Sequence, residues 1–326
     1  MNSDYIPRLR SELLRAGATE QARWRPARTA RVLRPLAAAA AVVLIAVAVV
    51  LAVPDRFGEE TAVERPTGTV ELSYRVEPAA AQQAAQVMRE RLSAAGIPGA
   101  GVSVSSGGLT ISAPAGASED VSALTKRGRL AIYDWEGSVL GPRGVPAPAD
   151  ASVTGSPDAG HSAAVTRAEA EARGGGRSAV VRARDSAEGW YALGGEPAIA
   201  NAGIARARPD VDPILKDPIV ALELTAQGQD AFTTLTRRLA HRGSEQAADG
   251  VGHEKARQHF AIVLDDRIVA VPYIDFRVVP DGIDGSAGTQ IQGGLSPETA
   301  RRIAALLSAG PLRADLVLES EDAPAG

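Results

Sequence analysis

The residues that could carry chemistry in this sequence are few, and their spacing is loose. The four histidines are His161, His241, His253 and His259. A polar stretch also gathers four side chains of the metal-ligating type: Asp249, His253, Glu254 and His259. Their spacing fits no compact ligand pattern, and a solvated loop explains the stretch equally well. We therefore predict no metal site.

Other patterns that resemble catalytic features have simpler explanations. Asp265 and Asp266 stand between two apolar runs, where adjacent acids are first of all turn residues. The glycine-rich stretches 107–108, 174–176 and 293–294 lack the lysine and the strand-to-helix context of a phosphate-binding loop. The sequence also contains no serine-hydrolase or zinc-protease motif and no cysteine. We predict a protein that is not an enzyme, with no catalytic residues and no cofactor.

Composition narrows the class of protein further. The chain has 326 residues, of which 45% are hydrophobic and 23% charged, a balance that suits about two globular domains. Its 35 basic and 39 acidic residues give a net charge of -4. Because a nucleic-acid-binding surface needs an excess of basic residues, we do not expect nucleic acid as a partner.

One segment has the properties of a membrane span. Residues 36–53 carry no charge, and at about 1.5 Å per residue a helix of this length approaches the roughly 30 Å of a bilayer core. The preceding tail, 1–35, holds eight arginines against three acidic residues, so the remaining chain is strongly acidic. The positive-inside rule then predicts a cytoplasmic N-terminus and an extracytoplasmic remainder. A cleaved signal peptide is the alternative.

The first folded part is predicted to follow a charged linker, residues 54–68. Alternation of apolar and polar residues from 69 to 77 indicates a strand, and Pro78 then opens a helix that ends near Gly96. A hairpin over 102–111, a helix capped at Ser118 and a strand over 130–135 complete the order β-α-β-β-α-β. This order predicts an α+β fold with a ferredoxin-like base over residues 69–135.

The second half is predicted to be an irregular α+β head, residues 136–294. It should contain a strand over 219–225, a helix with Phe232, Leu235 and Leu239 on one face, and a polar insertion over 241–258. A hairpin over 260–271 should centre on Ile262, Val263, Leu264, Ile268 and Val269, and a short strand should cover 290–292.

Residues 295–320 form the last predicted segment. A helix starts at Ser296-Pro297-Glu298 and stops at Gly310, and a strand follows over 312–318. These two elements can return to the base, and the second half could also repeat the β-α-β-β-α-β order of the first.

The order and spacing of several motifs resemble a known family. The run AIVLDDRIVAVPYI (261–274), followed by TQIQGGLSPETARRIAALLSAGPLRADLVL (289–318), looks like the end of the first extracytoplasmic (P1) domain of SecD, an accessory subunit of the Sec protein-export machinery. Upstream, Thr225, Gly228 and Phe232 match a helix start of the type Thr-x-x-Gly-x-x-x-Phe. The resemblance spans about residues 69–319. One departure is Asp266, which stands where the family has a turn glycine.

The resemblance implies a binding module outside the membrane, accessory to protein export. Its expected partners are the bilayer, an extended exported polypeptide, components of the Sec translocase or another membrane protein, bound for example at an exposed sheet edge. The alternative is a membrane-anchored envelope sensor whose arginine-rich tail contacts a cytoplasmic regulator, and an extracytoplasmic hydrolase is a third. SecD conducts protons through several membrane helices. Because this sequence shows one uncharged span, we expect no proton path from this chain alone.

Overall fold

The computed structural model describes residues 68–105, 108–141, 143–146, 166–176, 178–183, 189–213, 215–292 and 295–322. The predicted tail, membrane span and most of the linker, 1–67, lie outside the described residues. Among those that are described, no helix is both long and apolar enough to span a membrane. They form a mixed α+β structure with three sheets.

The first sheet has four strands in the order β14-β1-β3-β2, and every neighbouring pair is antiparallel. Its elements are β1 Thr69–Arg75, α2 Ala81–Ala94, β2 Gly101–Ser105, β3 Gly108–Pro114, α3 Ser118–Leu124 and β14 Val317–Asp322. Single 3-10 turns, η1 Pro78–Ala80 and η2 Ala115–Ala117, precede the two helices. The alternation in β1 buries Val70, Leu72 and Tyr74 on one face, as its sequence pattern predicts.

The strand predicted to close this sheet lies elsewhere. β4, Leu130–Asp134, pairs with β10 and β7 in a second sheet, and β14 takes the place beside β1. The reason is burial: four of the five β4 residues are buried, which suits an interior strand, whereas all six β14 residues are exposed, which suits an edge. The last strand also begins at Val317 rather than at residue 312.

The second sheet has seven strands, in the order β6-β5-β11-β10-β4-β7 with β12 paired to β10. Its remaining strands are β5 Ala179–Arg182, β6 Trp190–Leu193, β7 Ile199–Ala200, β10 Gln258–Leu264, β11 Arg267–Ala270 and β12 Tyr273–Ile274. All seven β10 residues are buried. The predicted hairpin is confirmed, since β10 pairs with β11 across Asp265 and Asp266, whose φ angles of 50° and 62° are those of a tight turn.

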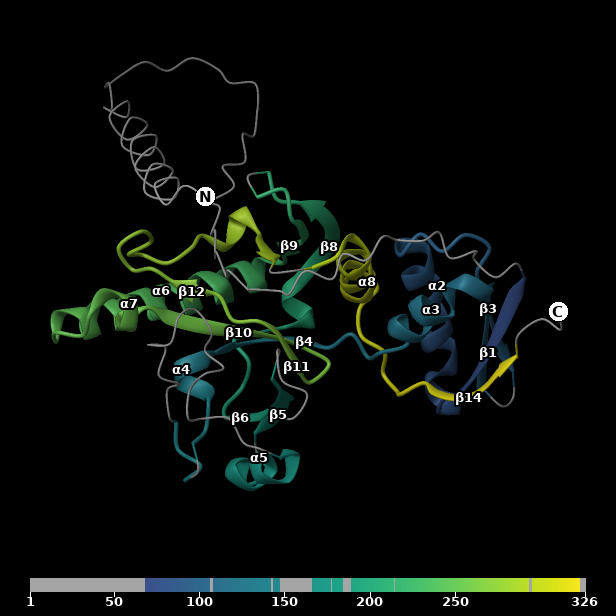
Figure 1. Ribbon diagram of the computed structural model, residues 1–326, viewed down its shortest axis with the longest axis horizontal. Helices are drawn as coiled ribbons and strands as arrows, with labels where there is room; N and C mark the ends of the chain where they lie inside the picture. Colours follow the sequence, from purple (N-terminus) through teal and green to yellow (C-terminus); the bar gives the residue numbers. More distant parts are fainter. Residues whose placement is uncertain are drawn as a thin grey trace, which may run out of the picture. The chain divides into compact units, whose positions relative to one another are not determined.

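The third sheet has the order β13-β9-β8 and consists of β8 Ile204–Val211, β9 Pro218–Leu224 and β13 Thr289–Ile291. The remaining elements are the helices α4 Trp135–Ser138, α5 Arg167–Gly174, α6 Ala226–Ala248, α7 His253–Ala256 and α8 Pro297–Ser308, and the 3-10 turns η4 Asn201–Gly203 and η5 Gly285–Ala287. Helix α8 begins at the predicted cap, where the Ser296 hydroxyl accepts a hydrogen bond from Thr299 N at 3.1 Å. It contacts β8 and β9, and also α2 and α3 (Figure 1).

Two predictions for the second half are wrong. The stretch 241–258 is not a loose insertion, because α6 continues to Ala248 and α7 follows. Buried Ala240 and Gly243 keep this part of α6 packed. Nor does the second half repeat the first: β9 pairs with β8 and β13, whereas β10 belongs to another sheet. Local patterns identified these strands but did not specify their pairing.

A buried arginine holds the junction between the first sheet and the rest of the fold. Arg91, on α2, is fully buried, and its guanidinium donates to four backbone carbonyls. The acceptors are Leu124 O at 2.7 Å, Lys126 O, Arg127 O at 2.9 Å and Gly310 O at 2.7 Å. Burial lowers the pKa of Arg91 to about 10, so it is still charged near neutral pH. One cation thus joins α2 to the chain after α3 and to the chain after α8.

The neighbouring turn fixes the same junction from the other side. The Asp265 carboxylate accepts hydrogen bonds from Gly128 N at 3.0 Å and Arg129 N at 2.9 Å. Asn201 bonds both Leu130 N and Gly128 O. Gly128 has a φ of +73°, and a Cβ there would lie 2.6 Å from the Arg91 guanidinium. Glycine is therefore required at this position.

We predict that Arg91→Met destabilises the protein strongly, because four carbonyls lose their donor and each buried acceptor left without one costs about 1 to 3 kcal/mol. Thermal and chemical denaturation of the purified chain measures the change. The control is Arg89→Met on the same helix, where an exposed side chain makes one bond, to Val102 O. Equal effects of the two substitutions would contradict the role assigned to Arg91.

Candidate functional site

The candidate site is built on helix α6. The motif Thr225, Gly228 and Phe232 stands at the start of this helix, and each of its residues has a structural role there. The Thr225 hydroxyl caps the helix by accepting from Gly228 N at 3.1 Å. Gly228 packs against Gly203, since a Cβ at position 228 would lie 2.1 Å from Gly203 O. Phe232 is buried edge-to-face on Phe260, with ring centroids 5.8 Å apart. The motif therefore sets the position of α6 against η4 and β10.

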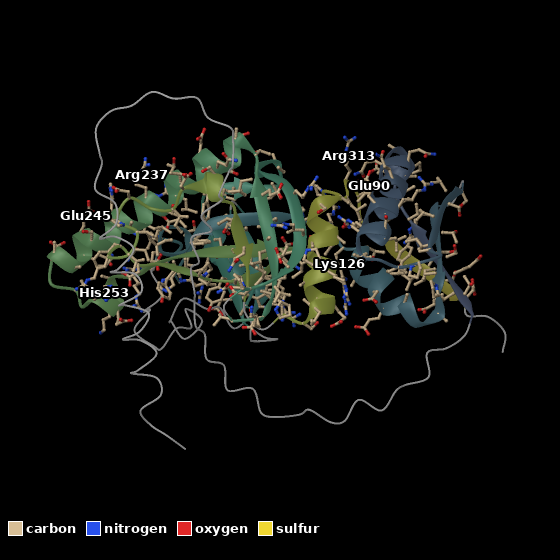
Figure 2. All side chains as sticks on the ribbon, turned by 90° about the horizontal axis from the view of Figure 1, so that it is seen from above. Glu90, Lys126, Arg237, Glu245, His253 and Arg313 are labelled. Carbon is tan, nitrogen blue, oxygen red and sulfur yellow. The ribbon has the colours of Figure 1, made fainter. Side chains whose placement is uncertain are left out.

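The opposite face of α6 lines an open groove of about 540 Å³. Its lining residues recur at helical spacing: Thr234, Arg237, Arg238, His241, Arg242 and Glu245. We call this surface the α6 groove. Figure 2 labels Arg237 and Glu245 along the helix. The inward face carries the predicted core residues Phe232, Leu235 and Leu239, all buried.

Below the groove, Arg242 is held by two carboxylates from β4 and α4. Its guanidinium makes two parallel bonds to Asp134, at 2.7 and 3.0 Å, and a third to Glu136 at 3.3 Å. Its Nε donates to Gln258 Oε1. Bidentate pairing of this kind fixes orientation as well as charge. Asp134 also caps α4 by accepting from Gly137 N at 3.0 Å.

The network continues to β10. Glu136 accepts from His259 N at 2.9 Å, and its Oε1 lies 2.6 Å from His259 Nδ1. Gln258 Nε2 donates to Gln246 Oε1 at 2.9 Å. The side chains of Glu136 and His259 are each only 9% exposed. This buried network anchors the groove on three elements.

The rim of the α6 groove presents donors. Arg238 makes one ion pair, to Asp134 at 3.3 Å, and its side chain is 55% exposed. Arg237 donates to Asp281 O at 3.3 Å, and His241 is exposed. Among the described residues, Glu245 is the one acidic side chain that lines the groove. Such a rim can bind carboxylates and backbone carbonyls of a ligand.

The two histidines of the polar stretch, His253 and His259, have different partners. His253 Nε2 lies 2.9 Å from Asp275 Oδ1, whereas His259 bonds Glu136. Burial raises the pKa of Asp275, but hydrogen bonds, first that from His253, outweigh it, and the pKa is lowered. In the described part of the chain no three His, Cys, Asp or Glu side chains form a group that could hold a metal. His161 lies outside the described residues.

The arginines of the groove were missed by sequence reasoning, although a signal was present. Arg237, Arg238 and Arg242 follow one another at intervals that place them on one helical face. Ending the helix before residue 241 hid this periodicity, and the partners Asp134 and Glu136 are distant in sequence. Only the folded structure brings them together.

Comparison with known proteins shows that this site lies in a region that matches a known subdomain. Residues 178–314 match the family model "SecDF, P1 head subdomain", and the described residues that line the α6 groove fall in that range. None of the curated proteins matches the chain.

Three solved structures are similar to it. SecDF in its super-membrane-facing form is 20% identical with a TM-score of 0.49, over 79% of this chain and 30% of that one. A membrane component SecDF that enhances protein export is 18% identical with a TM-score of 0.44, over 78% and 98%. SecDF of Thermus thermophilus, a translocon-associated membrane protein, is 19% identical with a TM-score of 0.31, over 79% and 31%. The matched region thus spans about a third of the longer SecDF chains.

We predict that Arg242→Met destabilises the protein by up to about 3 kcal/mol, because two largely buried carboxylates lose the cation they share and Asp134 keeps only the more exposed Arg238. Adding Asp134→Asn should restore part of the loss, since the amide keeps the bond to Gly137 N without a buried charge. Arg238→Met, on the same helix and facing the same acid, is the control. Denaturation curves that do not distinguish Arg242→Met from Arg238→Met would show that the network is not the anchor of the groove.

Proposed function

We propose that this chain is a non-enzymatic, extracytoplasmic binding module accessory to protein export, because residues 178–314 match the SecDF P1 head subdomain, in line with the resemblance in its sequence. Its proposed ligand is an extended segment of an exported polypeptide, and its proposed binding surface is the α6 groove. The observation that carries this proposal is that the described lining of the groove falls within the residues that match the head subdomain.

The groove suits such a ligand for three reasons. It is open to solvent and follows about three turns of α6, so an extended chain can lie along it. Its rim donors complement carbonyls and acidic side chains, which favours acidic stretches of a polypeptide. The network of Arg242, Asp134, Glu136 and His259 holds α6 in place, so little ordering is needed on binding.

The first sheet supports a proposed division into head and base. The elements β1, α2, β2, β3 and α3, with β14 as the fourth strand, have the order and antiparallel pairing of a ferredoxin-like fold. We propose that residues 69–124 and 315–322 form this base and that 125–314 form the head. The family match ends at residue 314, directly before the chain returns to the base, which agrees with this division.

The proposed location and partners follow from the same family and from the sequence. We infer that residues 36–53 anchor the chain, with the tail in the cytoplasm and the described part outside. Because a related SecDF is described as translocon-associated, components of the Sec translocase are proposed neighbours of this chain. The alternative of an envelope sensor depends on the arginine-rich tail, which lies outside the described residues.

The test is binding of a fluorescent, unstructured peptide rich in Asp and Ser to the full chain in detergent, measured by anisotropy. We predict saturable binding that weakens at least about tenfold in Arg237→Glu/Arg238→Glu, because two rim donors become repulsive. The variant Arg301→Glu, which reverses a charge at an exposed position on α8, should bind the peptide as the unaltered chain does. No saturable binding, or equal binding by the groove variant, would contradict the proposed site.

A further inference from the structure

The strand β14 presents an unusually open sheet edge. It stands at the end of the order β14-β1-β3-β2, so only its β1 side is paired. All six of its residues are exposed, and Val317 and Leu318 are each 47% exposed. An unpaired edge exposes backbone N–H and C=O groups that can accept a further strand.

The edge of β8 is protected, in contrast to that of β14. On β8, the N–H and C=O of Ala207 are both bonded by the Ser308 hydroxyl, and Pro209 has no N–H to offer. The next outward N–H, of Val211, is bonded by Asp210 Oδ1 at 2.9 Å. These contacts block strand addition in the way that natural proteins protect edges.

The edges β6 and β2 are also partly covered. On β6, Ala192 O accepts from Leu140 N at 2.9 Å, so the chain after α4 lies along that edge. On β2, Arg89 donates to Val102 O at 2.9 Å. Among the described residues we find no comparable contact on the outer side of β14. The edge of β14 is therefore more open than those of β8, β6 and β2.

The charge of this edge selects the kind of partner. From Asp315 to Asp322 the chain carries four acidic residues, Asp315, Glu319, Glu321 and Asp322, and no basic one. Arg127 pairs bidentately with Asp315, which precedes β14, and Arg75 makes an exposed pair with Glu319; Glu321 and Asp322 therefore leave the strand acidic. A second copy of the same edge, or an acidic polypeptide, would be repelled.

We propose that the β14 edge binds a lysine- or arginine-rich extended segment of another protein, which adds to the four-stranded sheet as a fifth strand. Backbone hydrogen bonds supply the mode of binding, and the acidic side chains select a basic partner. This surface is distinct from the α6 groove, because β14 lies outside residues 178–314 and its charge is opposite to that of the groove rim. The inference does not rest on the proposed function.

The experiment uses the full chain in detergent and three synthetic fluorescent peptides of equal length. The first alternates Lys and Val, the second is the same peptide with alternate backbone nitrogens methylated, and the third alternates Glu and Val. We predict saturable, salt-sensitive binding of the first peptide but not of the second, measured by anisotropy; the acidic third peptide should bind only at the α6 groove, so Arg237→Glu/Arg238→Glu should abolish its binding. N-methylation removes the donors that strand addition needs while keeping the charge.

Matched variants locate the binding. Glu321→Lys/Asp322→Lys should weaken binding of the Lys-Val peptide at least about tenfold, while keeping the Arg75–Glu319 pair. The control Glu90→Lys/Glu196→Lys makes the same change of net charge at exposed positions away from β14; Figure 2 labels Glu90 on α2. Unchanged melting temperatures establish that both variants fold.

Three outcomes would overturn the proposal. The first is no binding of the Lys-Val peptide, which would mean that the acidic residues serve only to protect the edge against aggregation. The second is equal binding of the N-methylated peptide, which would indicate charge attraction without strand addition. The third is equal loss in the two double variants, which would place the binding elsewhere. The arginine variants of the α6 groove should bind the Lys-Val peptide normally, so failure here is distinguishable from failure of the proposed function.

Discussion

The fold depends on the burial of one cation, Arg91, at the place where the chain crosses between the four-stranded sheet and the rest of the structure. The four-stranded sheet receives its fourth strand, β14, only at residue 317, nearly two hundred positions after α3. The two chain segments that connect this sheet with the rest of the structure must therefore be held together. The Arg91 guanidinium bonds carbonyls of both, at Leu124 and at Gly310, and α8 packs against α2 beside it. A guanidinium suits this role because its donors point in several fixed directions.

Local features were predictable from the sequence, and long-range pairing was not. The hairpin at Asp265 and Asp266, the cap at Ser296 and the apolar face of α6 each depend on residues that are close in sequence. The exchange of β4 for β14 depends on which sheet has room for a largely buried strand, and alternation within one strand does not encode that choice. The network around Arg242 could not be predicted from the sequence for the same reason, because its carboxylates are more than a hundred residues away.

The two proposed surfaces have opposite charges and different physical modes of binding. The α6 groove offers side-chain donors on a helix that a buried network holds in place. The β14 edge offers backbone groups flanked by acidic side chains. An extended polypeptide of mixed charge could engage either surface through different segments, and this combination suits a module that handles unfolded chains of varied sequence.

The most direct test of a role in protein export is site-specific photocrosslinking in intact cells, with a photoreactive side chain in place of His241 on the groove rim. We predict crosslinks to exported polypeptides, and their yield should rise when export is stalled. A photoreactive side chain at the exposed position Glu298 on α8, outside the groove, is the control. Crosslinks at position 241 only to cytoplasmic proteins, or a yield that does not respond to export, would contradict the central claim.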